Sequence, residues 1–149
     1  MKIRFVTLGC KLNFAESSAI GKALLQRGHT RAKQGEEADI CVINTCSVTA
    51  VADKKNRAII RRCRRDHPEA VIGVCGCYSQ HDAEAVRALG ADVIGGSGQR
   101  QQFIDMLLET AATRQKQENL DVALRRREFE VLPAGGLEER TRAMLKVQD

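Results

Sequence analysis

The sequence predicts an α/β fold: an open, mostly parallel sheet of about five strands with helices on both faces. Two observations carry this prediction. Short apolar runs recur along the chain, and segments with helical spacing of apolar residues separate them. Each run is also too short to be a helix. The 149 residues suffice for one domain and a tail.

The first strand is expected at Lys2–Thr7, and Gly9 follows its end. A helix should come next, because Asn13 is a good N-cap residue and Glu16 stands three positions later, as in a capping box. Gly28 should end this helix, since glycine readily adopts the left-handed conformation that closes helices.

A short edge strand is expected at His29–Ala32. The run Ile40–Asn44 is apolar almost throughout, as is typical of a parallel strand buried on both faces. A helix should then span Thr49–Asp66, with Pro68 ending it. These three elements form the second strand–helix unit.

A further buried strand is expected at Ala70–Val74. Ser79 is a suitable N-cap for a helix over His81–Leu89, and Gly90 should end that helix. The run Ala91–Ile94 predicts one more strand. Right-handed crossovers would place the helices on both faces of the sheet, as in flavodoxin-like and Rossmann-like three-layer folds.

The last helix is expected at Gln101–Arg114, and the texture of the sequence changes after it. We therefore expect a domain over residues 1–113 and a polar, Pro/Gly-containing linker over 114–140. Residues 141–149 return to an alternating pattern, which predicts the first strand of a further domain that is cut short.

Composition narrows the class of protein. The formal net charge is +5 and the chain holds four Phe, one Tyr and no Trp, so it fits an anionic partner but not a base-stacking platform. No apolar run is long enough to span a bilayer, and the amino terminus does not resemble a signal peptide. We therefore expect a cytoplasmic protein, in which six cysteines favour metal binding or catalysis over disulfides.

Three of the six cysteines follow predicted strand ends: Cys10, Cys46 and Cys77. The carboxyl ends of parallel strands meet at one edge of a sheet, so residues separated by 35 and 30 others can converge there. Each also precedes a predicted helix, whose amino terminus favours a thiolate. Gly9 and Gly76 would let the backbone pass close to a bulky inorganic group. We expect either a metal or cluster site here or cysteines that merely fit tight turns.

The remaining cysteines, Cys41, Cys63 and Cys75, are expected to be small apolar fillers. Cys75 is the exception to watch, because it lies two residues from Cys77 and would point the same way on a strand. Asn44 and Thr45 flank Cys46 and are expected to donate hydrogen bonds to cluster sulfurs.

The helix over residues 49–66 is strongly basic. Its face is a candidate contact for RNA phosphates, although a solvated helix surface would look the same. The seven residues concerned are Lys54, Lys55, Arg57, Arg61, Arg62, Arg64 and Arg65.

Three motifs around the cysteines resemble those of the radical S-adenosylmethionine methylthiotransferase family. They are Thr7-Leu8-Gly9-Cys10-Lys11-Leu12-Asn13, Asn44-Thr45-Cys46-Ser47-Val48-Thr49 and Gly76-Cys77-Tyr78-Ser79-Gln80. The run Ala52–Arg57 resembles the branch that acts on N6-threonylcarbamoyladenosine in tRNA. The resemblance covers about residues 1–110, and residues 142–149 resemble the entry into the next domain of the family.

The resemblance implies that Cys10, Cys46 and Cys77 ligate one [4Fe–4S] cluster with an open iron that takes part in sulfur insertion. It implies a second [4Fe–4S] cluster, held by a CxxxCxxC motif in a central barrel, which cleaves S-adenosylmethionine. The family reaction would place a methylthio group on C2 of the modified adenosine at position 37 of tRNA. Other branches act on isopentenyladenosine in tRNA or on a ribosomal protein.

The 149 residues contain no CxxxCxxC motif and no carboxyl-terminal RNA-binding domain. We therefore expect this chain to be inactive alone and its parent to be the enzyme. Two other hypotheses remain at this point: a flavodoxin-like binding module without a cluster, and a thiol redox protein that uses Cys75 and Cys77.

Overall fold

A computed structural model describes residues 1–120 of the chain and shows one open sheet. The strand order is β2-β1-β3-β4-β5-β6, and every neighbouring pair within the described residues is parallel. The strands are β1 (Lys2–Thr7), β2 (Thr30–Arg31), β3 (Ile40–Thr45), β4 (Val71–Gly76), β5 (Val93–Gly95) and β6 (Gln117–Asn119). The predicted α/β class and parallel sheet are confirmed.

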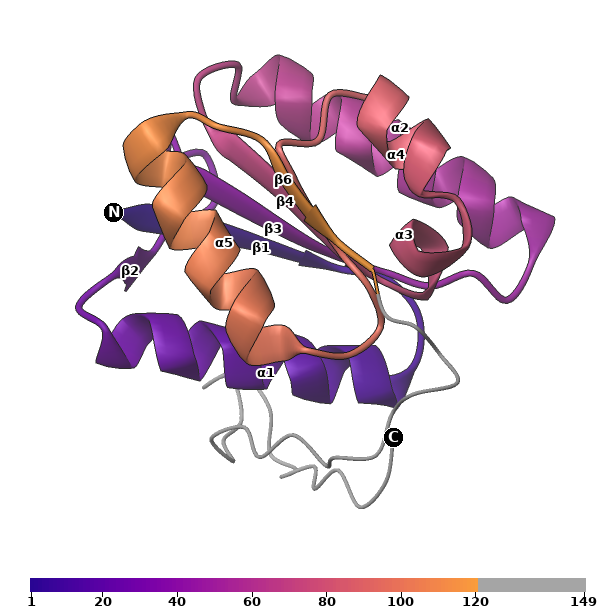
Figure 1. The fold of residues 1–149 in the computed structure, drawn as a ribbon, viewed down its shortest axis with the longest axis horizontal. Coiled ribbons are helices and arrows are strands. Elements are labelled where there is room, and N and C mark those ends of the chain that lie inside the picture. Colours follow the sequence, from indigo (N-terminus) through magenta and orange to yellow (C-terminus); the bar gives the residue numbers. More distant parts are fainter. Residues whose placement is uncertain (121–149) are drawn as a thin grey trace.

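Helices cover both faces of this sheet, so the molecule has three layers (Figure 1). The helices α1 and α5 lie on one face, and α2, α3 and α4 lie on the other. Their bounds are α1 (Lys11–Gln26), α2 (Ala50–Asp66), α3 (Cys77–His81), α4 (Ala83–Ala88) and α5 (Arg100–Thr113).

The core consists of two apolar layers, one on each side of the central strands. Ile40 and Val42 of β3 pack toward the layer with α1 and α5, whereas Cys41 and Ile43 pack toward the layer with α2 and α4. Side chains alternate faces along a strand, so both faces of β3 and β4 must be apolar. All six residues of each of these strands are buried.

The sheet has one strand more than expected. Residues 117–119 form β6, which pairs with β5 at the sheet edge, although this stretch was predicted to be linker. Its sequence, Gln-Glu-Asn, lacks the apolar run on which the prediction relied, because an edge strand is covered less than a central one. The rest of the predicted linker, and the strand predicted from Arg142, lie outside the described residues.

The predicted capping box at the first helix is wrong. Helix α1 begins at Lys11 with Cys10 as its N-cap residue, so Asn13 and Glu16 lie inside the helix, both buried. The Asn13 amide instead donates to the carbonyl oxygens of Leu8 at 2.8 Å and Thr45 at 2.9 Å. The pattern resembled a cap because both tasks require a short side chain that hydrogen-bonds nearby backbone.

The helix predicted over residues 81–89 is α4, which spans only Ala83–Ala88, and the short helix α3 before it was not predicted. Ser79 caps neither helix. Ser79 is fully buried in α3, and its hydroxyl contacts the carbonyl oxygens of Gly76 at 3.0 Å and Gly95 at 2.6 Å. Asp82 caps α4, since its side chain accepts from the Ala85 N–H at 3.2 Å. Within the described part of the chain, no helix is both long and apolar enough to cross a membrane.

Candidate metal centre

The three predicted ligands follow three adjacent strands, β1, β3 and β4, at the carboxyl edge of the sheet. Cys10 is exposed at the start of α1, and Cys77 is exposed as the first residue of α3. Cys46 follows β3 directly and is 5% exposed. It is separated from α2 by three residues, so only the other two thiols lie at a helix start. The topology therefore brings the three cysteines to one edge, as predicted.

Burial and neighbouring negative charges both act on the Cys77 thiol. Burial raises the pKa of the Cys77 thiol, and negative charge at Cys46, at Glu16 and at Cys10 raises this pKa further. The expectation that a helix start favours a thiolate stays a prediction at Cys77, where burial and like charge act in the opposite direction. Such repulsion between neighbouring thiolates is what a bound cationic metal group removes, because metal coordination deprotonates a thiol.

Two glycines let the cysteine loops approach one another. Gly9 has a φ of +106°, and a Cβ placed on it would lie 2.3 Å from the Cys46 Cβ and 2.9 Å from its Sγ. Gly76 has a φ of +107°, and a Cβ there would lie 2.2 Å from the Thr45 carbonyl oxygen. Both positions combine a left-handed backbone with contact to the neighbouring loop, so only glycine fits without a shift.

Buried asparagines tie these loops together. Asn44 donates its amide N–H to the Asn13 carbonyl oxygen at 3.0 Å and contacts Ser17 Oγ at 3.3 Å, while Thr45 donates to the Cys75 carbonyl oxygen at 2.7 Å. These side-chain donors serve the loops themselves, and the expectation that Asn44 and Thr45 donate to cluster sulfurs stays a prediction. The Asn44 Oδ1 atom is buried with no partner among the described residues.

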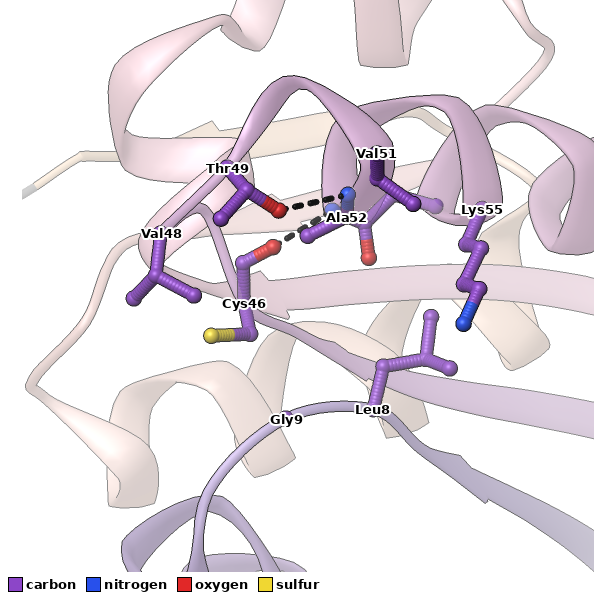
Figure 2. A pocket seen from close by; sticks show the side chains of 9 residues that line it. Leu8, Gly9, Cys46, Val48, Thr49, Val51, Ala52 and Lys55 are labelled. Atoms are coloured by element: carbon purple, nitrogen blue, oxygen red, sulfur yellow. Dashed lines mark hydrogen bonds between the residues drawn. The ribbon is translucent and has the colours of Figure 1, made fainter.

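A pocket of about 240 Å³ opens beside Cys46, between the β1–α1 loop and the start of α2 (Figure 2). Leu8 and Gly9 form one side, and α2 and the loop before it form the other. Figure 2 shows Cys46 and Val48 at one end of the pocket and Lys55 at the other, beside Leu8. The Asn56 side chain also lines it and donates to the Cys46 carbonyl oxygen at 2.6 Å.

The other three cysteines lie away from this edge. Cys41 and Cys63 pack in the apolar layer under α2, with their thiols in hydrogen-bonding contact. Cys75 lies in the opposite layer, completely buried, and burial raises the pKa of its thiol to about 11. Because Cys75 faces the core while Cys77 is exposed on α3, the expectation that they point the same way is wrong.

The placement of the three thiols bears on the kind of metal group that they could hold. Among the residues that the structure describes, no three His, Cys, Asp or Glu side chains lie close enough to share one metal ion. An iron–sulfur cluster places each cysteine on a different iron, so its ligands stand further apart than those of one ion. Three thiols at one edge, glycine-lined loops and mutual repulsion at Cys77 all suit such a group.

The basic residues of α2 divide into two groups. Arg64 is structural, because its guanidinium binds Asp92 and the carbonyl oxygens of Gly90 and Ala70. Arg57 contacts the Tyr78 hydroxyl at 3.3 Å, and Arg62 and Arg65 both pair with Asp66. The exposed residues Lys54, Lys55 and Arg61 carry no such contact within residues 1–120. These three exposed residues are therefore the ones of the seven candidates that remain available for an RNA contact.

A buried ion pair near the cysteines was not predicted. Arg100 at the start of α5 binds Glu16 of α1 at 2.5 Å, with side chains only 1% and 5% exposed. Arg100 also donates to the carbonyl oxygens of Gly96 at 2.7 Å and Ser97 at 3.0 Å. The negative charge of Glu16 raises the pKa of both the Cys75 and the Cys77 thiol. No local signal reveals this pair, because its members stand 84 positions apart.

Curated relatives match the chain over nearly its whole length. It is 36% identical over 148 residues to the threonylcarbamoyladenosine tRNA methylthiotransferase MtaB of Bacillus subtilis (strain 168), covering 99% of this chain and 33% of that protein. It is 33% identical over 111 residues to the tRNA-2-methylthio-N(6)-dimethylallyladenosine synthase of Rhodopirellula baltica, covering 71% of this chain and 23% of that protein. The chain thus spans about a third or less of these relatives' length.

Among solved structures, a response regulator from Thermotoga maritima matches with a TM-score of 0.54 and 16% identity, covering 74% of this chain and 97% of that one. This likeness shows the fold alone. A family model described as "Uncharacterized protein family UPF0004" matches residues 2–96, which include all three cysteine loops. The chain therefore belongs to the UPF0004 family, with threonylcarbamoyladenosine tRNA methylthiotransferases among its relatives.

Proposed function

We propose that this chain holds a [4Fe–4S] cluster on Cys10, Cys46 and Cys77, as the cluster-binding domain of a tRNA methylthiotransferase. One observation carries the proposal: Cys10, Cys46 and Cys77 follow three adjacent parallel strands at one edge of the sheet. The names of the relatives in the threonylcarbamoyladenosine branch support the reaction. The product would carry a methylthio group at C2 of N6-threonylcarbamoyladenosine at position 37 of tRNA.

The protein's part in this function is to hold three thiolates and leave one iron without a protein ligand. When bound, the cluster supplies an open iron to which the sulfur of the product can attach. Cys46, nearly buried behind Gly9, would anchor the inner side, while the exposed Cys10 and Cys77 would hold the outer side. The hydrogen bonds of Asn13 to Leu8 and Thr45 fix the spacing of the loops.

The rest of the reaction requires residues beyond this sequence. The 149 residues contain no CxxxCxxC motif, so we propose that a second [4Fe–4S] cluster and S-adenosylmethionine bind elsewhere in the parent protein. The chain alone would then perform no radical chemistry. We place the parent enzyme in the cytoplasm, where tRNA is its substrate.

The exposed residue Arg61 of α2, which makes no ion pair within residues 1–120, would contact tRNA phosphates. Each phosphate neutralised by a basic residue releases a counterion, so removal of a contact lowers the dependence of affinity on salt concentration. Arg61→Gln should weaken tRNA binding by the full-length enzyme and reduce its salt slope by about one. Arg64→Gln should mainly lower stability, because Arg64 is occupied by Asp92 and backbone carbonyls.

Anaerobic reconstitution with iron and sulfide tests the cluster proposal. We expect about four irons and four sulfides per chain. Mössbauer spectra should show one iron site that differs from the other three and changes on addition of a thiol, because the protein leaves that iron free. Absence of iron uptake would favour a binding module without a cluster. A disulfide between Cys75 and Cys77 in place of iron would favour a thiol redox protein, which the burial of Cys75 disfavours.

A further inference from the structure

The pocket beside Cys46 has the composition of a binding subsite. Its volume of about 240 Å³ is smaller than the roughly 300 Å³ at which pockets for whole drug-sized ligands begin, so it suits a substituent of a larger ligand. Its walls are largely apolar, and Val48 and Val51 form an open rim with 77% and 65% exposure. Two polar side chains, Lys55 and Asn56, also line it.

Asn56 supplies an acceptor that nothing in the described chain fills. Its side chain is 0% exposed, and its Nδ2 is committed to the Cys46 carbonyl oxygen at 2.6 Å. Its Oδ1 has no hydrogen-bond partner among the described residues. A buried acceptor without a donor is costly and uncommon, so its position in a pocket wall points to a ligand that brings an O–H or N–H group.

Lys55 supplies a positive charge at the other end of the same pocket. Its side chain extends from α2 beside Leu8 (Figure 2), and within residues 1–120 it has no ion pair. The nearby acid Asp53 accepts a hydrogen bond from Ser47 at 2.9 Å. The pocket therefore offers one cation, one buried acceptor and apolar walls in a small volume.

We infer that this pocket receives the threonylcarbamoyl group of the substrate adenosine, and that Lys55 and Asn56 recognise it. That group carries a carboxylate for Lys55, hydroxyl and amide donors for Asn56 Oδ1, and a methyl group for Val48 and Val51. This inference rests on the proposed function, since the cluster ligand Cys46 and Gly9 line the same pocket. A base with its C2 at the cluster could thus extend its N6 substituent into this space.

The same chemistry would select against a dimethylallyl group. That substituent has no charge and no hydrogen-bond donor. It would therefore leave Asn56 Oδ1 without a hydrogen bond and would remove water from Lys55 without forming an ion pair with it. Sites with polar groups aimed at a substrate reject an analogue that lacks the matching groups, because the unpaired groups lose their water. Lys55 and Asn56 would therefore be specificity-determining residues.

Calorimetric titration of the full 149-residue chain, free of metal, tests the inference. The probes are N6-threonylcarbamoyladenosine, its methyl ester and N6-dimethylallyladenosine. We expect the carboxylate nucleoside to bind about tenfold or more tightly than the other two, as befits one charge-assisted hydrogen bond. Lys55→Gln should remove this difference. Lys54→Gln is the matched control, because Lys54 is an exposed lysine on the same helix that does not line the pocket.

A second variant places the opposite charge at the rim. Val51→Asp should weaken binding of the carboxylate nucleoside and leave the ester unchanged, and Val51 is exposed enough that the fold should tolerate it. No preference for the carboxylate nucleoside, or equal losses in Lys55→Gln and Lys54→Gln, would overturn the inference. Iron uptake separates this from the proposed function: a chain that binds four irons but shows no preference refutes only the pocket, and the reverse result refutes only the cluster.

Discussion

The six cysteines form two groups of three that lie in different parts of the fold. Cys10, Cys46 and Cys77, the carboxyl-edge cysteines, stand in loops at one edge of the sheet beside glycines with positive φ. The core cysteines Cys41, Cys63 and Cys75 are buried in the apolar layers. Thiols suit both places, because the side chain is a small hydrophobe when protonated and a metal ligand when ionised.

The contacts that hold the backbone around each group also differ. Polar side chains such as Asn13 and Asn56 hold the loops of the carboxyl-edge cysteines. Their buried amide groups donate hydrogen bonds to the backbone carbonyl oxygens of these loops. Around the core cysteines, apolar contacts suffice. These loops therefore depend on buried polar contacts that the surroundings of the core cysteines do not require.

The largest expected difference between the groups is in iron uptake. Replacement of Cys10, Cys46 or Cys77 by Ala should reduce iron after reconstitution from about four per chain to nearly none, because a cubane needs all three thiolates. Iron and sulfide analysis measures this. Cys63→Ala is the control and should keep full loading, since its thiol lies in the layer under α2. Full loading of Cys10→Ala would show that the ligand set is wrong.

The next effect concerns the backbone of the edge loops. Gly76→Ala should lower the free energy of unfolding by about 4 kcal/mol, the sum of a left-handed residue and a clash with the Thr45 carbonyl. Gly28→Ala, at a φ of +86° with no atom within 4 Å, should cost only about 1 kcal/mol. Urea denaturation of the metal-free chain measures both, and equal costs would mean that the loops are not tightly packed.

Glu16 influences both groups of cysteines, because its negative charge raises the pKa of Cys75 in the core and of Cys77 at the edge. Glu16→Gln should lower the free energy of unfolding by about 3 kcal/mol, since Arg100 would remain as a buried charge with a weaker partner. Asp105→Asn breaks the exposed pair with Arg27 and should cost about 0.5 kcal/mol or less. Thermal denaturation compares them, and similar losses would contradict the importance assigned to burial.

The smallest effect concerns thiol reactivity in the metal-free chain. The pKa of Cys77 is raised, so its thiolate fraction at neutral pH is below that of an ordinary thiol and grows as pH rises through the raised pKa. Alkylation of Cys77 by iodoacetamide should accelerate with pH beyond the range where a free cysteine levels off. Cys46→Ala should shift this profile slightly to lower pH, by removing one like charge but not the burial. Mass spectrometry of the labelled peptides follows each site, and an unchanged profile would place Cys46 too far away to matter.

Much of the fold could be predicted because its strands are apolar on both faces. Ile40–Thr45 and Val71–Gly76 are wholly buried, and a run of this kind has few other structures open to it. The edge strand Gln117–Asn119 could not be predicted in the same way. Its three residues are polar, and its pairing with β5 uses backbone hydrogen bonds, which leave no pattern in the sequence.

The three carboxyl-edge cysteines could be predicted from their place after strands, because the topology of a parallel sheet brings such positions together. Their supporting residues could not. Asn13 and Glu16 have the spacing of a capping box, which made them look like helix-cap residues. The ion pair between Glu16 and Arg100 depends on the packing of α1 against α5. The pocket residue Asn56 looked like any polar residue on a basic helix, because its burial depends on the loop that it holds.

The parallel direction of β6 determines where the chain leaves this domain. Asn119 lies at the end of β6 on the same side of the sheet as the ends of β3 and β4, so residue 120 departs from the edge that carries the cysteines. An antiparallel final strand would have delivered the chain to the opposite side.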